Sequence, residues 1–258
     1  MQAPKQILTT WRKFDDFPME TLSKAWFYEK KQPNRQRDIT EMKEHRSQYG
    51  IAGNCFDLSI WLLDEFSKHG IEAYPIGHRL KTNSAHAAVI AIDENGRRYL
   101  CDLGDQWINP ILIDSNSEDY SNEKQSGFFP AADVEVIPAG QIFDIVYYRP
   151  NGKRSQQTYH TEPIETAFFL EAAEWSQRNV KPNPLFECRI PYKSEIAHWE
   201  FDNWKSCLST SEGLFHETTG QTVEDWADKI SLLSEYDKQF LIEALEIYKK
   251  GTTWCMRG

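Results

Sequence analysis

The chain has 258 residues, of which 40% are hydrophobic and 13% aromatic, and its formal net charge is −10. This length and apolar content predict an ordered globular protein, built as one large domain or as two to three packed subdomains. The acidic balance and the lack of a basic run argue against a nucleic-acid-binding protein, because no stripe of cations is present to neutralise phosphates.

The N-terminal stretch MQAPKQILTTWRKFDDF has no apolar signal core and no cleavage site, and the chain contains no run of about eighteen apolar residues. We therefore expect no membrane partner and a cytoplasmic location. The cysteines are odd in number, widely spaced and without a CxxC pair: Cys55, Cys101, Cys188, Cys207 and Cys255. This pattern predicts reduced thiols and neither a disulfide framework nor a zinc ribbon.

Helix and connecting chain are predicted for residues 1–52. Pro18 begins a run of helical periodicity that Pro33 interrupts. The apolar face of this run is formed by Leu22, Ala25, Trp26 and Tyr28. The polar and charged stretch 30–50 is expected to be a solvated face or loop, which is commoner than a binding patch.

The next helix is predicted to start at a cysteine. Apolar residues recur at three- and four-residue spacing from Leu58 to Phe66, and Gly70 ends the pattern. Asn54 is the expected N-cap, so Cys55 falls in the first turn, where unpaired backbone N–H groups and the positive end of the helix dipole favour a thiolate. Cys55 is therefore the candidate nucleophile, and a small buried hydrophobe is the alternative interpretation.

Strand patterns follow this helix. A short strand is predicted for residues 73–79, and a β-hairpin for residues 86–92 and 99–103. The turn of the hairpin has the sequence Asp-Glu-Asn-Gly and ends at Gly96. A three-residue loop with Gly96 in the left-handed conformation is favoured, because glycine adopts that conformation without strain.

The register of this hairpin decides where two titratable residues lie. The three-residue loop puts His86 and Asp102 on one face as diagonal neighbours, whereas a two-residue turn puts them on opposite faces. Asp102 lies between apolar residues, where an unpaired carboxylate is costly to bury, so it needs a partner. His86 is the candidate base and Asp102 the acid that orients it, and His78 on the preceding strand is the alternative base.

The remainder of the chain alternates between strands and helices. Residues 113–125 are polar and acidic and are expected to form a surface loop. Strand patterns around 134–136, 142–148 and 155–161 are sufficient, with the hairpin, for a small barrel or a strongly curved sheet. Further elements are predicted as a helix over 164–178, a strand over 186–191, and helices over 222–233 and 234–251.

Together these elements predict an α+β fold in three parts. Residues 1–72 form a helical subdomain that carries the nucleophile, residues 73–162 form an antiparallel β-barrel-like sheet, and residues 163–258 form a C-terminal α/β subdomain.

A cysteine that opens a helix, a histidine that begins a strand and an aspartate that ends the next strand follow in the order Cys55, His86, Asp102. This plan resembles that of the transglutaminase-like and papain-like thiol enzymes, with their cysteine-proteinase-like core. Within that set the chain is most similar to the arylamine N-acetyltransferases, through GNCFDLSIWLLDEFSKHGIEAYPIGHR around Cys55, AHAAVIAID around His86 and YLCDLG around Asp102. The stretch FFLEAAEWSQRNVKPNPLFECRI adds a weaker match, so the resemblance covers roughly residues 40–190.

The resemblance implies a Cys55–His86–Asp102 triad that transfers an acyl group by a ping-pong reaction through an acyl-cysteine. It implies acetyl-CoA or another acyl-CoA as co-substrate, an arylamine or hydrazine as acceptor, no permanently bound cofactor and no metal. The C-terminal subdomain would act as a lid, in a monomer or homodimer. The backbone N–H of Cys55 is the expected oxyanion donor, and residues 49–54 are the place where a second donor is expected.

Two stretches differ from the pattern of the family. Residues 51–54 are Ile-Ala-Gly-Asn where the family usually has Arg-Gly-Gly and an aromatic residue, and residues 104–107 are Gly-Asp-Gln-Trp where it has Gly-Phe-Gly. Asp105 would repel the phosphates of coenzyme A. The alternatives are a transglutaminase-like or peptidase-like enzyme acting on a peptide amide, an amide synthase acting on a carrier-bound acyl chain, and a catalytically silent binding domain of the same fold.

Overall fold

The computed structural model describes residues 2–30, 35–217 and 222–250, so Pro33, Gly251 and Cys255 lie outside the described residues. The helices are α1 (Lys5–Trp11), the short 3-10 helix η1 (Arg12–Phe14), α2 (Leu22–Glu29), α3 (Ile39–Tyr49), α4 (Cys55–Lys68), α5 (Thr166–Arg178), α6 (Val223–Ser234) and α7 (Lys238–Lys249). Within these ranges no helix is both long enough and apolar enough to cross a bilayer.

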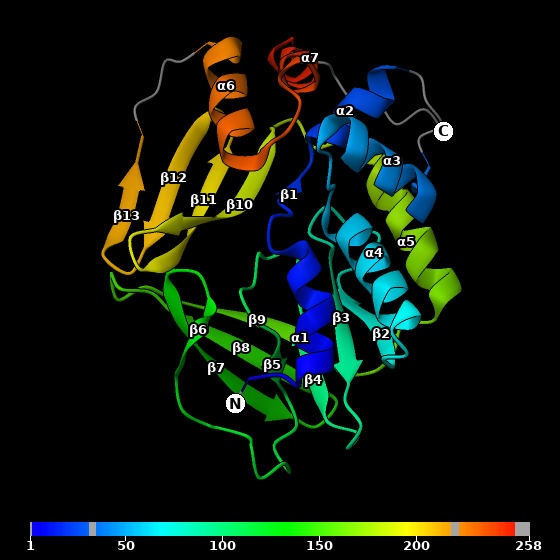
Figure 1. Cartoon of the computed structure of the whole chain (residues 1–258), viewed down its shortest axis with the longest axis vertical. Helices are drawn as coiled ribbons and strands as arrows, with labels where there is room; N and C mark the ends of the chain where they lie inside the picture. The colour runs from blue at the N-terminus through cyan, green and yellow to red at the C-terminus, as the bar shows by residue number, and fades with distance from the viewer. Residues whose placement is uncertain (1, 31–34, 218–221, 251–258) are drawn as a thin grey trace.

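The strands form three antiparallel sheets, which confirms the α+β class (Figure 1). The hairpin sheet has the order β2 (Ala73–His78), β3 (His86–Ile92), β4 (Arg98–Cys101), β5 (Ile111–Leu112). The middle sheet has the order β6 (Gln125–Phe129), β7 (Ala132–Ala139), β8 (Ile142–Tyr148), β9 (Arg154–His160). The C-terminal sheet has the order β1 (Met19–Glu20), β10 (Leu185–Tyr192), β11 (Glu195–Asp202), β12 (Lys205–Thr210), β13 (Gly213–His216).

The single barrel-like sheet expected for residues 73–162 is replaced by two open sheets. Strands β2 and β9 lie against each other, but no ladder joins the hairpin and middle sheets in the described part of the chain. A side chain bridges this junction instead, because the Tyr74 hydroxyl donates to the carbonyl of Thr161 at 2.9 Å. The connection between β4 and β6 contains only the short strand β5 and is otherwise irregular. It therefore separates the middle sheet from the hairpin sheet along the chain.

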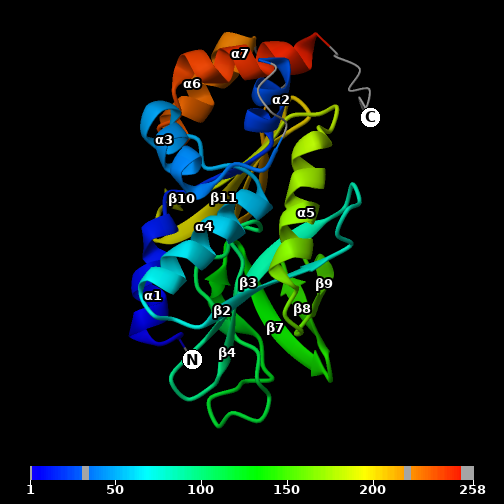
Figure 2. The same ribbon diagram turned by 90° about the vertical axis from the view of Figure 1, so that its right-hand side faces the viewer.

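Helix α4 begins at the predicted residue. The Phe56 N–H donates to the Asn54 side chain (2.9 Å), and the Asn54 N–H donates to Oδ2 of Asp57 (3.0 Å), which together form a capping box. Figure 2 shows α4 lying across the hairpin sheet, between α1 and α5. The cap and the packed sheet together fix the position of the first turn, where Cys55 lies.

The predicted register of the hairpin is confirmed. Ile92 pairs with Arg98 and Val89 pairs with Cys101, as the three-residue loop requires, and Gly96 has a φ of 75°. On the other edge of β3, His86 pairs with His78 of β2. The strand therefore places both histidines at the same end of the sheet.

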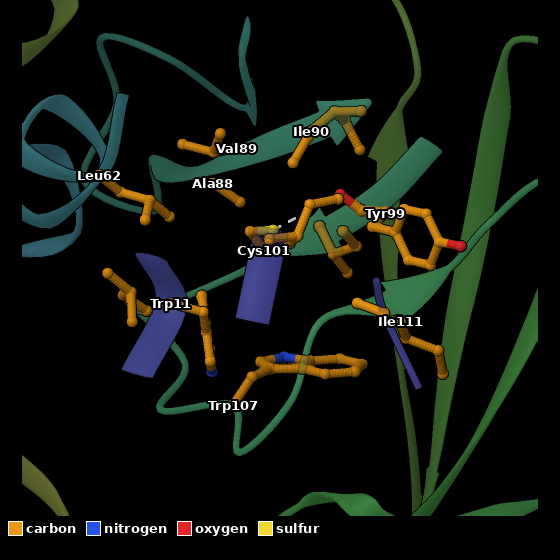
Figure 3. Packing of buried hydrophobic residues seen from close by; sticks show 14 of the residues in the cluster. Trp11, Leu62, Ala88, Val89, Ile90, Tyr99, Cys101, Trp107 and Ile111 are labelled. Carbon is orange, nitrogen blue, oxygen red and sulfur yellow. Dashed lines mark hydrogen bonds between the residues drawn. The ribbon is translucent and has the colours of Figure 1, made fainter. Parts of the chain in front are cut away.

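A dense apolar core lies beneath the hairpin (Figure 3). Cys101 is fully buried within it, in the same cluster as Trp11, Leu62 and Trp107. Burial raises the pKa of the Cys101 thiol far above its usual range, so this cysteine is an inert core residue. Side chains alternate between the two faces along a strand. Asp102, which follows Cys101, is therefore directed to the face opposite this core.

The structure differs from the sequence-based prediction in several elements. Residues 39–49 of the stretch expected to be a solvated face or loop form α3, of which only Met42 is buried. Strands β1, β5, β6 and β11 to β13 were not predicted. Helix α7 starts at Lys238, after an Asp237 N-cap, and so begins later than the predicted residue 234.

Candidate active site

The imidazole of His86 and the carboxylate of Asp102 form a close pair. His86 Nε2 lies 2.6 Å from Asp102 Oδ2. Asp102 is fully buried, and it also accepts hydrogen bonds from the Tyr159 hydroxyl at Oδ2 (2.8 Å) and from the Asp105 N–H at Oδ1 (3.0 Å). These partners offset the cost of burying a carboxylate, and they fix its orientation toward the imidazole.

Cys55 is the third member of this group. Cys55 and His86 line one cavity, and the Cys55 side chain is one of the groups that raise the pKa of His86. Because Nε2 faces Asp102, Nδ1 is the ring nitrogen left open to other partners. Burial alone would lower the pKa of His86, but the charges of Asp102 and Asp105 and the hydrogen bonds with Asp102 and Cys55 raise it well above its usual value. The structure thus brings together the three predicted site residues, with a protonated imidazole favoured beside the sulfur.

Gly104 supplies the space in which these side chains meet. A Cβ atom at this position would lie 2.6 Å from Cys55 Cβ, 3.0 Å from His86 Cε1 and 3.3 Å from Asp102 Oδ1. Real Cβ atoms essentially never make a contact as short as 2.6 Å, so a larger residue at position 104 would force Cys55 or its neighbours to shift.

A buried ion pair supports the turn that precedes the nucleophile. Arg37 Nη2 lies 3.1 Å from Asp57 Oδ2, with side chains that are 5% and 0% exposed. The same Asp57 oxygen accepts from the Asn54 amide (2.8 Å). A Cβ atom at Gly53 would lie 2.4 Å from Arg37 Nη2, so glycine allows the arginine to approach the backbone closely. The sequence analysis missed Arg37, because it lies in the charged stretch that was expected to be solvated.

Two donors in residues 49–54 are already engaged. The Ala52 N–H donates to the hydroxyl of Tyr236 (2.6 Å), and the Asn54 amide nitrogen bonds Asp57 and Gln177 (2.8 and 3.1 Å). Neither group is therefore available for an oxyanion in this conformation. Tyr236 follows α6, so the C-terminal region holds the segment just before Cys55.

The cavity beside Cys55 and His86 has walls from all three predicted parts of the chain. Its lining includes Lys24 from α2, Asp105 and, from the C-terminal part, Trp175, Lys181 and Leu185. Whether the C-terminal part moves as a lid remains a prediction.

Lys24 is a buried cation in this cavity that the sequence analysis did not single out. Its Nζ donates to the carbonyl (3.0 Å) and the hydroxyl (2.7 Å) of Ser176 on α5. Burial lowers the pKa of Lys24 below its usual value, against the opposing effect of Cys55 and Asp57. The helix that carries Lys24 was predicted from the sequence. Its packing against α5, which directs Lys24 toward the cavity, depends on contacts between residues distant in sequence and could not be predicted.

A second groove adjoins the first at His86. It shares Ala85, His86 and Lys181 with the cavity, and its other titratable lining residues are His78, Arg79 and His160. Among the described residues, none that lines this groove is acidic. The groove is therefore cationic, in contrast to the net charge of the whole chain.

His78, the alternative base, lies beside His86 but away from the carboxylate. The two ring centroids are 5.7 Å apart, and the contact with Asp102 is made by His86. Burial lowers the pKa of His78, and the charges of His86 and Arg79 lower it further. His78 is thus expected to be neutral, and the geometry favours His86 as the residue that exchanges protons with Cys55.

The set of possible metal ligands found in the described residues is His86, Asp102 and Asp105. Two atoms of this set are engaged with each other, His86 Nε2 and Asp102 Oδ2, and the latter also accepts from Tyr159.

No protein-family model and no curated protein sequence matches this chain. Several solved structures do match its fold. An arylamine N-acetyltransferase from Nocardia farcinica has a TM-score of 0.71 at 13% identity, over 98% of this chain and 90% of that chain. The enzyme of this name from M. smegmatis has a TM-score of 0.69 at 12% identity, over 94% of this chain and 90% of that chain.

An arylamine N-acetyltransferase from Mycobacterium marinum, solved in complex with CoA, has a TM-score of 0.63 at 9% identity. This match covers 90% of this chain and 83% of that one. At these identities the similarity establishes the fold. The chain has the fold of the arylamine N-acetyltransferases along nearly its whole length, which confirms the resemblance inferred from sequence at the level of structure.

Proposed function

We propose that this protein is an acyltransferase that moves an acyl group from acyl-CoA, with acetyl-CoA as the expected donor, to an arylamine or hydrazine. The observation that carries the proposal is that Cys55 and His86 line one cavity while Asp102 holds the imidazole of His86, in a chain with this fold. A cysteine, an imidazole and an orienting carboxylate are the groups that nucleophilic acyl transfer requires.

In the first half of the reaction, the Cys55 sulfur attacks the thioester carbon of the donor. The bond between that carbon and the CoA sulfur breaks, and CoA leaves as the thiolate. The N–H of Cys55 is in the first turn of α4, where backbone N–H groups have no intrahelical acceptor, and it is suited to stabilise the oxyanion that forms. The product is an acyl-cysteine.

The cationic groove supports a donor that carries phosphates. Arg79, His160 and Lys181 are placed around it, and it opens onto the cavity of Cys55 through His86 and Lys181. Asp105 does not line this groove. The repulsion that Asp105 was expected to cause therefore falls with distance for phosphates that lie in it.

The opposite part of the cavity suits a small aromatic acceptor. Met19, Trp175 and Leu185 contribute apolar surface to the lining near Cys55. In the second half of the reaction, the amine attacks the acyl-cysteine and releases the sulfur.

The proposal is tested by incubating the protein with acetyl-CoA and an arylamine and measuring both free CoA and the acetylated amine. The matched control is Cys55→Ala, which should give neither product. Cleavage of a peptide, or incorporation of an amine into a glutaminyl peptide, with no arylamine acetylation, would support the transglutaminase-like or peptidase-like alternative instead. Absence of all these activities would support the binding domain.

A further inference from the structure

Asp105 is a titratable group in the cavity that the Cys55–His86–Asp102 arrangement leaves unused. Its Oδ1 lies 3.7 Å from His86 Nδ1, and its side chain is 29% exposed. Its N–H donates to Asp102, which fixes its backbone. The imidazole is therefore flanked by one carboxylate near each ring nitrogen, and the carboxylate of Asp105 is the one that lines the cavity with Cys55.

We propose that Asp105 is a catalytic residue that accepts the proton of the attacking amine in the second half of the reaction. This inference rests on the proposed acyl transfer. The amine nitrogen bonds the acyl carbon, and the bond from that carbon to the Cys55 sulfur breaks. One N–H proton moves to the Asp105 carboxylate, and the electron pair of the broken bond stays on the sulfur as a thiolate. Asp105 then releases the proton to solvent.

His86 is poorly suited to that step in this chain. Its raised pKa keeps a proton on the imidazole, so it stabilises the departing thiolate but has little capacity to take a proton from the amine. Burial raises the pKa of Asp105 to about 7, against the opposing effect of His86 and with the support of Asp102. A base is most effective when its pKa lies near the working pH.

Several charged and titratable neighbours affect the pKa of Asp105. On the C-terminal sheet, Glu187 raises its pKa and His198 lowers it. His198 lies 3.5 Å from Glu187, and its own pKa is raised because the effects of Glu187 outweigh burial. The groups that act on Asp105, or on which it acts, are His86 of β3, Asp102 after β4, Tyr147 of β8, Tyr159 of β9, Glu187 of β10 and His198 of β11.

The two half-reactions can be measured separately. Cys55 is first loaded with p-nitrophenyl acetate, which gives acetyl-Cys55 whatever the natural donor is, and its discharge by an arylamine is then followed by intact mass. Asp105→Asn keeps the size and the backbone N–H of the residue. We expect this variant to slow discharge at neutral pH about 100-fold, and to slow loading at least tenfold less than that.

The pH profile provides a second readout. In the native protein, discharge to an arylamine, which is neutral over this range, should rise with pH through about 7 and then level off, because ionised Asp105 is the base. Asp105→Asn should lose this rise, and Asp105→Glu should restore part of it. Asp102→Asn is the matched comparison, and it should slow both half-reactions because it acts through His86.

Equal slowing of loading and discharge in Asp105→Asn would show that Asp105 only positions His86, and an unchanged discharge rate would also overturn the proposal. If acetyl-Cys55 of the native protein never transfers to the amine, the proposed function fails and this inference fails with it. If p-nitrophenyl acetate loads Cys55 but acetyl-CoA does not, the assignment of the donor fails alone, and the comparison of discharge rates still decides the role of Asp105.

Discussion

Oδ2 of Asp102 lies 2.6 Å from Nε2 of His86, and the same oxygen accepts the hydroxyl of Tyr159. Replacing Asp102 by Asn removes the charge that raises the pKa of His86. The new amide can also donate a hydrogen bond to His86 Nε2, which would favour the tautomer of the imidazole that carries its proton on Nδ1. We expect Asp102→Asn to slow acylation of Cys55 by about 100-fold or more, measured by intact mass over time. Tyr159→Phe should have a smaller effect, because Asp102 keeps its contact with His86. A rate for Asp102→Asn within about twofold of native would contradict this role.

The two neighbouring histidines should differ in their effect on the reactivity of Cys55. The pKa of His86 is raised, so its proton is retained as pH rises above the usual value of 6.5, whereas the pKa of His78 is lowered. Native Cys55 should therefore react with iodoacetamide at mildly acidic pH. We expect His86→Gln to reduce this rate about tenfold or more and His78→Gln to leave it nearly unchanged. Loss of reactivity in the His78 variant alone would show that His78 is the base.

Gly104→Ala tests the close approach of the chain to the site. The added Cβ would lie 2.6 Å from Cys55 Cβ and 3.0 Å from His86 Cε1, so one of these residues must move. We expect loss of Cys55 acylation and a fall of about 1–3 kcal/mol in the free energy of unfolding. Gly140→Ala is a useful comparison because its Cβ meets nothing within 4 Å, although its φ is 70°. Gly140→Ala should lower the free energy of unfolding by about 1 kcal/mol and leave the acylation of Cys55 intact.

The buried pair of Arg37 and Asp57 should contribute to stability, and a surface arginine nearby provides the control. Arg37→Met leaves Asp57 without its charged partner in a buried environment, so we expect a loss of about 3–5 kcal/mol in urea unfolding. Arg35 pairs with Glu41 at the surface, where both side chains are at least one-third exposed, and Arg35→Met should cost about 1 kcal/mol or less. Similar losses in the two variants would mean that the buried pair has no special role.

The parts of the site that could be predicted are those fixed by local chemistry. Asn54 caps α4 through neighbouring backbone groups, and Gly96 fixes the hairpin loop, so both could be inferred from the spacing of a few residues. The juxtaposition of His86 and Asp102 then followed from the period of the strand. Their role in catalysis stays a prediction.

The residues that were missed depend on contacts distant in sequence. Arg37 and the exposed Arg35 belong to the same charged stretch, and only the packing of the folded chain against Gly53 and Asp57 distinguishes them. Strands β11 to β13 carry many polar residues, because part of the C-terminal sheet faces solvent, and their pattern did not stand out. The division into two open sheets likewise depends on how the strands meet, which the alternation of side chains does not specify.

The central claim is that Cys55 carries the acyl group. The most direct measurement is the intact mass of the protein after incubation with acetyl-CoA alone. We predict the addition of one acetyl group, located on Cys55 by peptide mapping, absent from Cys55→Ala and lost on addition of an arylamine. A native protein that gains no acetyl group from acetyl-CoA or from p-nitrophenyl acetate, or gains one that remains in Cys55→Ala, would contradict the account.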